Sequence, residues 1–352
     1  MWPFQKQIRM IRYLCFWRVN SSLAVLPNPF SVELSKVLCT IISSRLPTRD
    51  AGKWKKCLLA YDNFIETVKS QQAPKTSELT PELSWPIQSV LFVYPCKNIY
   101  GNGEKIVWEL KLFGEDASHE FFIEVILPAM EEASLRTDSS WNYRNCIWGN
   151  FDIEAIYLAN QDRWDPLVSE GRLDLQYNVT SLQYTDDIFN KYSDPIKYNY
   201  RKIVWLTPFD FSSIFSSTKK YVQTDVLPVI DATPTLYGIV DALLYRLHSI
   251  LEGKRTAPEN VWNCFSEQET NQLHTLMDEI KRINTTNTDI LPSQHVIGHW
   301  IGHQTFARIP YTIYPYLELA SMLHIGRQTH VGCGTFQIVK YPAKYDSNSL
   351  NT

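Results

Sequence analysis

Hydrophobic and polar positions recur with two different periods along the chain, and they predict strands and helices in a regular order. Residues 8–19 are dense in aromatic and β-branched side chains, which predicts a strand. The stretch after Pro29 has apolar residues at the spacing of a helix with one buried face, namely Leu34, Val37, Leu38, Ile41 and Ile42. We therefore expect a strand followed by an amphipathic helix at the start of the chain.

Residues 105–114 show the period of two that is typical of a half-buried strand. One face of this strand would hold Ile106, Trp108, Leu110 and Leu112, and the other Lys105, Glu109 and Lys111. The other elements expected in this half are a helical insertion, the first strand of a hairpin, a helix and a last strand, at residues 52–72, 89–95, 117–135 and 147–157. The order β, α, β, β, α, β is that of a ferredoxin-like fold.

The same order is predicted a second time after an irregular stretch at 159–197. Its clearest element is a helix after Thr233-Pro234 with a continuous apolar stripe of Leu236, Ile239, Val240, Leu243, Leu244, Leu247, Ile250 and Leu251. Strands are also expected at 201–206, 294–309 and 335–340, and helices at 273–283 and 315–324. The sequence thus predicts an α+β fold of two tandem ferredoxin-like, RRM-like domains: residues 1–165 with a helical insertion at 50–85, residues 166–345, and a tail at 346–352.

The charge of the chain is unevenly distributed. The 352 residues hold 34 Lys and Arg against 37 Asp and Glu, a formal net charge of -3. Residues 1–57 alone hold ten basic side chains and two acids, so the rest of the chain holds 24 basic and 35 acidic groups. Clustered cations raise the local potential and favour a polyanion partner, and a basic face that is merely solvated is the alternative.

Cysteine usage and hydropathy exclude several classes of protein. The seven cysteines include no C-x-x-C pair and no Cys/His pair at zinc-finger spacing, so we expect neither a disulfide framework nor a metal site. No apolar run approaches the ~18 residues of a membrane span. We expect a cytoplasmic protein without a cofactor and without membrane contact.

A glycine-rich loop follows the helix expected at 315–324. Gly326, Gly332 and Gly334 allow positive φ angles and close approach of the backbone to a ligand. Successive backbone N–H groups in such a loop form a concavity for a phosphate, although a tight connection between helix and strand is the alternative interpretation. The spacing matches neither the dinucleotide fingerprint nor a P-loop.

Residues 317–336, LELASMLHIGRQTHVGCGTF, resemble the terminal glycine-rich loop of the CRISPR-associated RAMP superfamily. The resemblance is strongest to the sixth Cas protein, the endoribonuclease that cuts precursor CRISPR RNA. Residues 86–114, 202–252 and 298–302 resemble further segments of that family in the same order. The resemblance implies CRISPR repeat RNA as the partner, other Cas effector subunits as further partners, and metal-independent cleavage by attack of a 2′-OH.

Cleavage of this kind needs a proton acceptor, a proton donor and cations that stabilise the phosphorane. His has a suitable ordinary pKa, so His330 and His324 are the predicted catalytic residues, together with Lys36. The predicted RNA-binding residues are Gly326, Arg327, Thr329, Gly332 and Gly334 in the loop and Arg45, Arg49 and Lys53 near the N-terminus.

Two alternatives stay open. Family members with a characterised site commonly keep a His near the first helix, whereas this chain has no His before His119. This favours a catalytically inactive RAMP-type subunit that holds CRISPR RNA. The second alternative is an unrelated two-domain α+β binding protein whose glycine-rich loop is only a turn.

Overall fold

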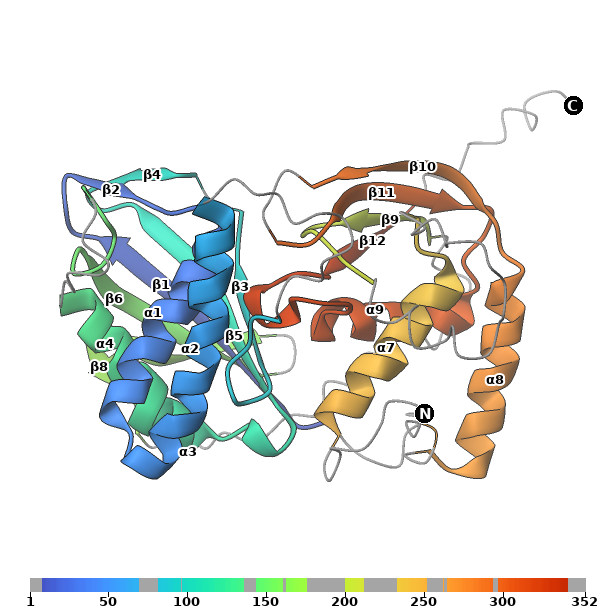
Figure 1. Cartoon of the computed structure of the whole chain (residues 1–352). Helices are drawn as coiled ribbons and strands as arrows, with labels where there is room; N and C mark the ends of the chain where they lie inside the picture. Colours follow the sequence, from blue (N-terminus) through green and yellow to red (C-terminus); the bar gives the residue numbers. More distant parts are fainter. Residues whose placement is uncertain are drawn as a thin grey trace, which may run out of the picture.

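Two α+β domains lie side by side, each built on an antiparallel sheet with helices on one face (Figure 1). The structure, a computed structural model, describes residues 8–69, 82–95, 97–135, 144–160, 163–175, 200–211, 233–251, 262, 265–293 and 297–340. The predicted fold class, α+β with ferredoxin-like strand order in both halves, is confirmed. Residues 70–81 of the predicted helical insertion and the tail at 346–352 fall outside the described residues.

The N-terminal sheet has the strand order of a ferredoxin-like domain with two strands added at one edge. Its order is β3-β5-β1-β6-β7-β8, and all its pairs are antiparallel. The strands are β1 (Met10–Val19), β3 (Ser89–Val93), β5 (Lys105–Phe113), β6 (Phe151–Asn160), β7 (Arg163–Ser169) and β8 (Arg172–Leu173). A separate ribbon joins β2 (Leu23–Val25) to β4 (Ile99–Gly101). The predicted domain boundary at 165 therefore cuts through β7, which pairs with β6.

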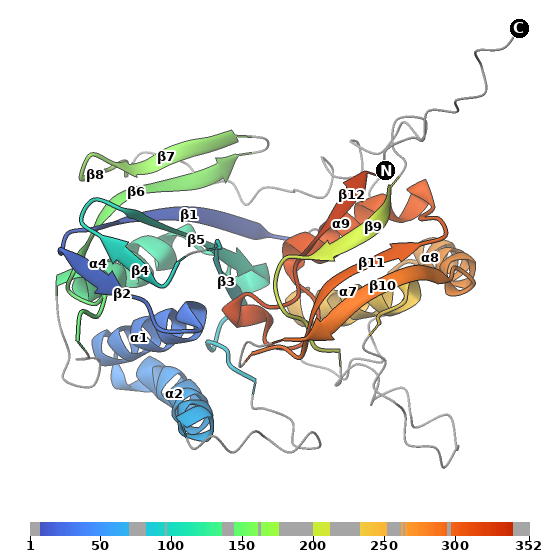
Figure 2. The ribbon, with the colours of Figure 1, turned by 90° about the horizontal axis from the view of Figure 1, so that it is seen from above.

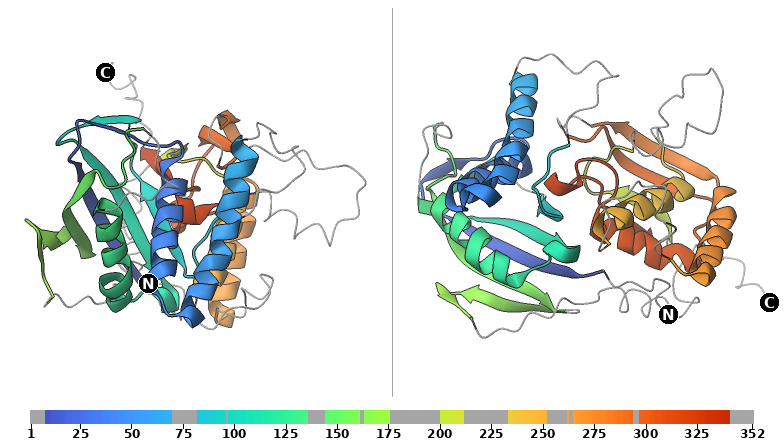
Figure 3. Two further views of the ribbon diagram at one scale, coloured as in Figure 1. Left: turned by 60° about the vertical axis from the view of Figure 1, so that its left-hand side comes forward. Right: turned by 60° about the horizontal axis from the view of Figure 1, so that its bottom comes forward.

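Helices cover one face of this sheet (Figure 3). They are α1 (Phe30–Arg45), α2 (Thr48–Lys69), the short α3 (His119–Phe121), a π-helical turn at Phe122–Ile126 and α4 (Leu127–Leu135). The predicted apolar face of α1 is buried, with Leu34, Val37 and Leu38 fully inaccessible. It packs over Trp17 and Trp108 of the sheet in one shared core.

The C-terminal sheet repeats the ferredoxin-like order as β10-β11-β9-β12. Its strands are β9 (Tyr200–Trp205), β10 (Thr285–Pro292), β11 (Trp300–Phe306) and β12 (Phe336–Lys340), and its helices are α7 (Leu236–Ile250), α8 (Glu267–Lys281) and α9 (Tyr314–Leu323). The helix α7 begins at Leu236, two residues after the predicted start at Pro234, because Thr235 is its N-cap: Thr235 Oγ1 accepts a hydrogen bond from the N–H of Gly238 at 3.0 Å.

Five strands were not predicted from the pattern, namely β2 and β4 of the separate ribbon, and β7, β8 and β10 at or next to a sheet edge. The strand β10 is almost wholly exposed and polar, so it has no apolar alternation; pairing with β11 along its whole length holds it in place. The strands β7 and β8 fall in the stretch expected to be irregular. Edge strands lack the two-sided burial that makes central strands recognisable.

The two domains share part of their core. Met10, Val90 and Phe113 of the N-terminal domain belong to the cluster formed by α7, α9 and β9 of the C-terminal domain. The strand β5 was predicted to expose its polar face to solvent. This prediction is wrong for Glu109 and Lys111. Glu109 and Lys111 are 2% and 5% exposed, because the end of α9 covers the second and Arg12 contacts the first.

Candidate nucleic-acid interface

The glycine-rich segment, residues 324–335, lies between the two domains rather than on the surface (Figure 2). Apart from the partly exposed Gly326 its residues are buried, and Arg327, Thr329 and His330 are 8%, 5% and 3% exposed. A Cβ at Gly332, where φ is +90°, would lie 2.9 Å from the carbonyl oxygen of Leu91 on β3. In this structure the segment fills the domain interface, and its contact with RNA stays a prediction.

Arg327 is held by carboxylates from both domains. Its Nη1 lies 3.3 Å from Asp210 Oδ2, and its backbone N–H donates to the carbonyl oxygen of Asp210 at 2.8 Å. Its Nε lies 3.8 Å from Glu82 Oε2. His299 Nδ1 also lies 3.6 Å from Asp210 Oδ2. The charge that was expected to contact phosphate is thus engaged inside the protein.

His330 links α1 to β3. Its Nε2 lies 2.7 Å from Ser35 Oγ, and its Nδ1 lies 3.0 Å from Ser89 Oγ and 3.2 Å from the Ser89 carbonyl oxygen. Tyr61 extends the chain, with its hydroxyl 2.6 Å from Ser35 Oγ. The carbonyl requires a proton on Nδ1, so Nε2 accepts from the serine hydroxyl. Burial lowers the pKa of His330 to about 3, and the imidazole is neutral at pH 7.

His324 is fully inaccessible and bridges the domains as well. Its Nδ1 donates to the carbonyl oxygen of Cys333 at 3.0 Å, and its Nε2 accepts from Lys111 Nζ at 3.2 Å. Burial, and then the charge of Lys111, hold the pKa of His324 well below its ordinary value. Neither predicted histidine is exposed to solvent in this structure. The ring nitrogens of both form hydrogen bonds within the protein, and these bonds join elements that are far apart in the sequence.

A buried cluster of charged residues, Arg12, Glu109 and Lys111, lies next to His324 and was not predicted from the sequence. Arg12 Nε lies 2.5 Å from Glu109 Oε1, and Lys111 Nζ donates to the carbonyl oxygen of Met322 at 2.9 Å. Burial lowers the pKa of Lys111 to about 8. Burial alone would raise the pKa of Glu109, but Lys111 and Arg12 hold it below its ordinary value. The only sequence signal for this cluster is that charged residues occupy alternate positions of a strand. The same pattern is typical of a solvent-exposed strand face.

A groove of about 760 Å³ runs between the domains above the glycine-rich segment. Residues from the start of α1, the end of β3, the loop after β9 and the segment itself line it. Its polar and aromatic lining includes Asn28, Ser31, Tyr94, Asn98, Glu109 and Lys111. Lys111 is its one lysine or arginine among the described residues. The groove therefore combines apolar and polar side chains with one buried cation, Lys111, and one buried carboxylate, Glu109.

The predicted cations of the N-terminal domain lie on the surface. Arg45, Arg49 and Lys53 are exposed on the last turn of α1 and the first half of α2. Arg45 Nη1 lies 3.1 Å from Glu132 Oε2. Lys36 is half-buried, and its Nζ lies 2.7 Å from Asp62 Oδ1 on α2. Arg49 and Lys53 thus lie on the same helix and are exposed, whereas the two histidines are buried.

Aromatic side chains lie on the sheet face that the helices leave uncovered. Phe16 and Tyr157 meet edge to face with ring centroids 5.6 Å apart, and the guanidinium of Arg12 lies 5.2 Å from the ring centroid of Trp164. All three aromatic residues are partly exposed. Such rings serve as stacking surfaces for bases in single-stranded nucleic acid. Tyr314 and Tyr316, beside the glycine-rich segment in the sequence, are buried, whereas Tyr311 is exposed.

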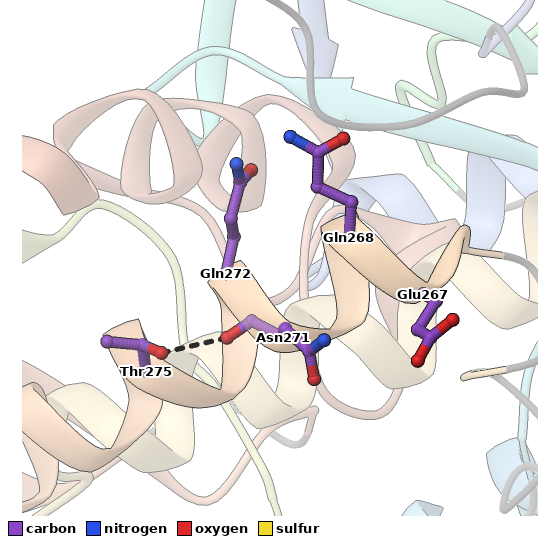
Figure 4. A pocket seen from close by; sticks show the side chains of 5 residues that line it. All are labelled: Glu267, Gln268, Asn271, Gln272 and Thr275. Carbon is purple, nitrogen blue, oxygen red and sulfur yellow. Dashed lines mark hydrogen bonds between the residues drawn. The ribbon is translucent and has the colours of Figure 1, made fainter.

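The structure has a further hollow on the outside of the C-terminal domain. A hollow of about 590 Å³ on α8 has all its lining residues on that one helix, so it has a single wall (Figure 4). Among the residues that the structure describes, no group of three or more His, Cys, Asp or Glu side chains is placed to hold a metal ion. None of the described helices is long and apolar enough to cross a membrane.

Comparison with known proteins places the fold. No protein-family model and no curated protein matches the chain. The chain is similar to a polypeptide of a partial Cas6-RT-Cas1–Cas2 complex, with a TM-score of 0.53 and 10% identity over 97% of this chain and 47% of that one. It is also similar to a polypeptide of the Cas6-RT-Cas1–Cas2 complex, with a TM-score of 0.53 and 10% identity over 97% of this chain and 30% of that polypeptide.

A Cas6 product complex aligns over 94% of this chain and 100% of its own, with a TM-score of 0.44 and 12% identity. The chain spans less than half the length of the two larger polypeptides. At 10% identity, the likeness to the two larger polypeptides shows a shared fold over nearly the whole chain.

Proposed function

We propose that this protein binds CRISPR repeat RNA across the groove between its two domains and processes it. The observation that carries the proposal is the groove itself, which lies between two ferredoxin-like domains and has the buried Lys111 in its wall. The shared fold with a Cas6-containing polypeptide supports it. The exposed cations of α2 would hold the RNA backbone, and Phe16, Tyr157 and Trp164 would stack on unpaired bases.

Lys111 is the best candidate for chemistry in the groove. Cleavage by a 2′-OH needs groups that move protons near neutral pH and a cation beside the phosphate. An amine with a pKa of about 8 is partly neutral at pH 7 to 8, so it suits either task. The chemistry would proceed without a metal and leave a 2′,3′-cyclic phosphate and a 5′-OH.

The second candidate is an RNA-holding subunit that does not cleave. The burial of His324 and His330 favours it, since neither neutral imidazole meets solvent. In that case the groove binds repeat RNA, and Lys111 serves to join β5 to the end of α9 through Met322.

Incubation of the whole chain with repeat RNA in EDTA distinguishes the two candidates. Excess enzyme in single turnover should give one cut with a cyclic phosphate end, and the rate should follow a group with an apparent pKa near 8. Lys111→Met should abolish the cut and keep most of the affinity. Tight binding without any cut supports the non-cleaving subunit, and no binding contradicts the proposal altogether.

Lys105→Met is the matched control for Lys111→Met. Lys105 lies on the same strand, but its Nζ pairs with Glu154 Oε1 at 2.5 Å on the exposed part of the sheet. Its removal should leave the cleavage rate unchanged. A loss equal to that of Lys111→Met would show that any change of charge on β5 disturbs the protein.

A further inference from the structure

Arg12 and Lys111 face each other on neighbouring strands of the N-terminal sheet. Arg12 of β1 is directly opposite Lys111 of β5 in the register, and both alternate with residues that the helices bury. The Cβ atoms of directly opposite residues lie about 5 Å apart, so two like charges at such a pair repel each other. Glu109 lies two residues before Lys111 on the same face of β5, so its carboxylate stands beside both cations.

Glu109 is buried at the groove and is engaged by the first of these cations. It is 2% exposed and is the one carboxylate among the described residues that line the groove. Its Oε1 lies 2.5 Å from Arg12 Nε, and the guanidinium lies 5.2 Å from the ring centroid of Trp164. A buried ion pair usually adds little stability compared with apolar side chains of the same size. Stability alone therefore does not explain why this pair lies beside Lys111.

The amine of Lys111 is held in a defined position in the groove lining. Its Nζ donates to the carbonyl oxygen of Met322 at 2.9 Å and lies 3.2 Å from His324 Nε2. These two bonds use two of the three protons of a charged amine. The ring of His324 is neutral, because burial and then the charge of Lys111 hold its pKa well below the ordinary value. The histidine therefore orients the amine and does not balance its charge.

The charge of Lys111 depends on the groups around it. The titratable groups that face the amine or its neighbouring carboxylate are Arg12, Tyr94, Glu109, Arg246 and His324. The tyrosine and the histidine are neutral at pH 8, because burial raises the pKa of the first and lowers that of the second. Burial lowers the pKa of Lys111 to about 8; Glu109 opposes this change, whereas the two arginines act in the same direction as burial. Of these groups, Glu109 is the one that favours the charged amine.

We propose that Glu109 is a positioning residue for Lys111: its carboxylate keeps the amine charged, and Arg12, which binds the carboxylate, limits this effect. The inference deepens the proposed function and rests on it, because Lys111 is the group assigned there to the chemistry. A charged amine in the groove stabilises a phosphate and has a proton to give to a leaving oxygen. Glu109 acts through Lys111 and does not itself contact RNA.

Carbon-13 NMR of the lysine side chains in the whole chain, followed from about pH 6 to pH 10, measures the charge of Lys111. Its resonance is the one that disappears in Lys111→Met. Glu109→Gln should lower the apparent pKa of Lys111 from about 8 to about 7, and Arg12→Gln should raise it to about 9. Opposite directions are the signature, because a general loosening of the sheet would move both variants the same way. No change in either variant, or changes in the same direction, overturns the inference.

The exposed end of the same two strands provides matched controls. Arg18 of β1 is directly opposite Lys105 of β5, and these two cations pair with Asp152 and Glu154. Arg18→Gln and Glu154→Gln remove the same kinds of charge as the test variants, but where the side chains are partly exposed. Both should leave the Lys111 resonance unchanged. Shifts as large as those of the test variants would show that any charge on this face acts on Lys111, and would overturn the inference.

Variants that keep the charge preserve the test if a buried charge is needed for folding. Arg12→Lys retains the cation and should hold the apparent pKa of Lys111 near about 8. Glu109→Asp, whose carboxylate is one methylene shorter, replaces Glu109→Gln if that variant does not fold, and it should lower the pKa by a smaller amount. Thermal unfolding checks every variant. An unchanged pKa in Glu109→Asp and in Arg12→Gln counts against the role of Glu109.

Single-turnover cleavage of repeat RNA over the same pH range separates this inference from the proposed function. If both are right, the pH dependence of the rate shifts with the NMR value in each variant. Cleavage that needs Lys111 but keeps one pH dependence in all variants contradicts the inference alone. If the NMR values shift as expected and the wild-type chain does not cut, the proposed cleavage fails and the positioning of Lys111 by Glu109 stands.

Discussion

The glycine-rich segment and the first half of α2 were both predicted to contact RNA, but the first is buried in the structure and the second is exposed. Arg49 and Lys53 on α2 point into solvent, while Arg327 and His330 are buried between the domains. A helix on the outside of a domain keeps its cations in water, where a polyanion can reach them. A loop at a domain interface has its polar groups paired with protein atoms. Residue type alone therefore does not separate a binding cation from a structural one.

The largest effect should come from removing the buried charge of Arg327. Arg327→Ala leaves Asp210, 3% exposed, without its guanidinium, and loss of one partner of a buried pair costs about 4 kcal/mol. Chemical unfolding measures it. Arg49→Ala is the counterpart on α2 and should change the unfolding free energy by less than about 0.5 kcal/mol. Equal effects of the two changes would remove the distinction between the regions.

Gly334→Ala should destabilise the protein by about 3 kcal/mol, because φ is +81° and the new Cβ would overlap the carbonyl oxygen of Ile325. Gly103→Ala is a matched control. Its φ is +82°, but nothing lies within 4 Å of its Cβ, so only about 1 kcal/mol is expected. Thermal unfolding of both variants separates backbone strain from close packing. Similar losses would mean that the segment is loosely packed.

Acid should weaken the domain interface through His330. The folded pKa of about 3 lies below the unfolded value of ~6.5, so the unfolded chain binds more protons below pH 6.5 and stability falls as the pH falls. The loss between pH 6.5 and 5 is about 1.5 kcal/mol from this residue. Burial is the main cause, and the charge of Arg246 adds to it. His330→Gln should flatten the pH dependence by that amount; an unchanged slope would show that His330 is not buried in solution.

The smallest effect concerns α2 and is seen in RNA binding rather than in stability. The double change Arg49→Ala and Lys53→Ala should weaken repeat RNA binding severalfold. It should also reduce the slope of log K against log salt concentration by about 1.4, because each of the two lost phosphate contacts contributes ~0.7. Arg308→Ala, an exposed cation of the C-terminal domain that faces Glu279, is the control. Gel shifts at 50 to 200 mM salt measure the slope. An unaltered slope would show that the basic face is only solvated.

Local pattern was enough for much of the fold. The apolar face of α1, the alternation in β5 and the capped start of α7 each follow from neighbours within one or two turns of the chain. The strand β10 could not be predicted, because its pairing with β11 and not its own residues makes it a strand. The helical insertion at 50–85 was predicted as well, and α2 occupies its first part.

Local residue patterns are sufficient to predict the ferredoxin-like order of the main elements, the basic N-terminal region and a glycine-rich connection between a helix and a strand. Which charged side chains remain exposed depends on how the two domains pack against each other. Ser35 and His330 are 295 positions apart, and Lys111 and His324 are 213 apart. No periodicity encodes such contacts, since they arise when two separately patterned domains pack together. That packing buries the predicted histidines, lowers their pKa, and leaves Lys111 in the lining of the groove.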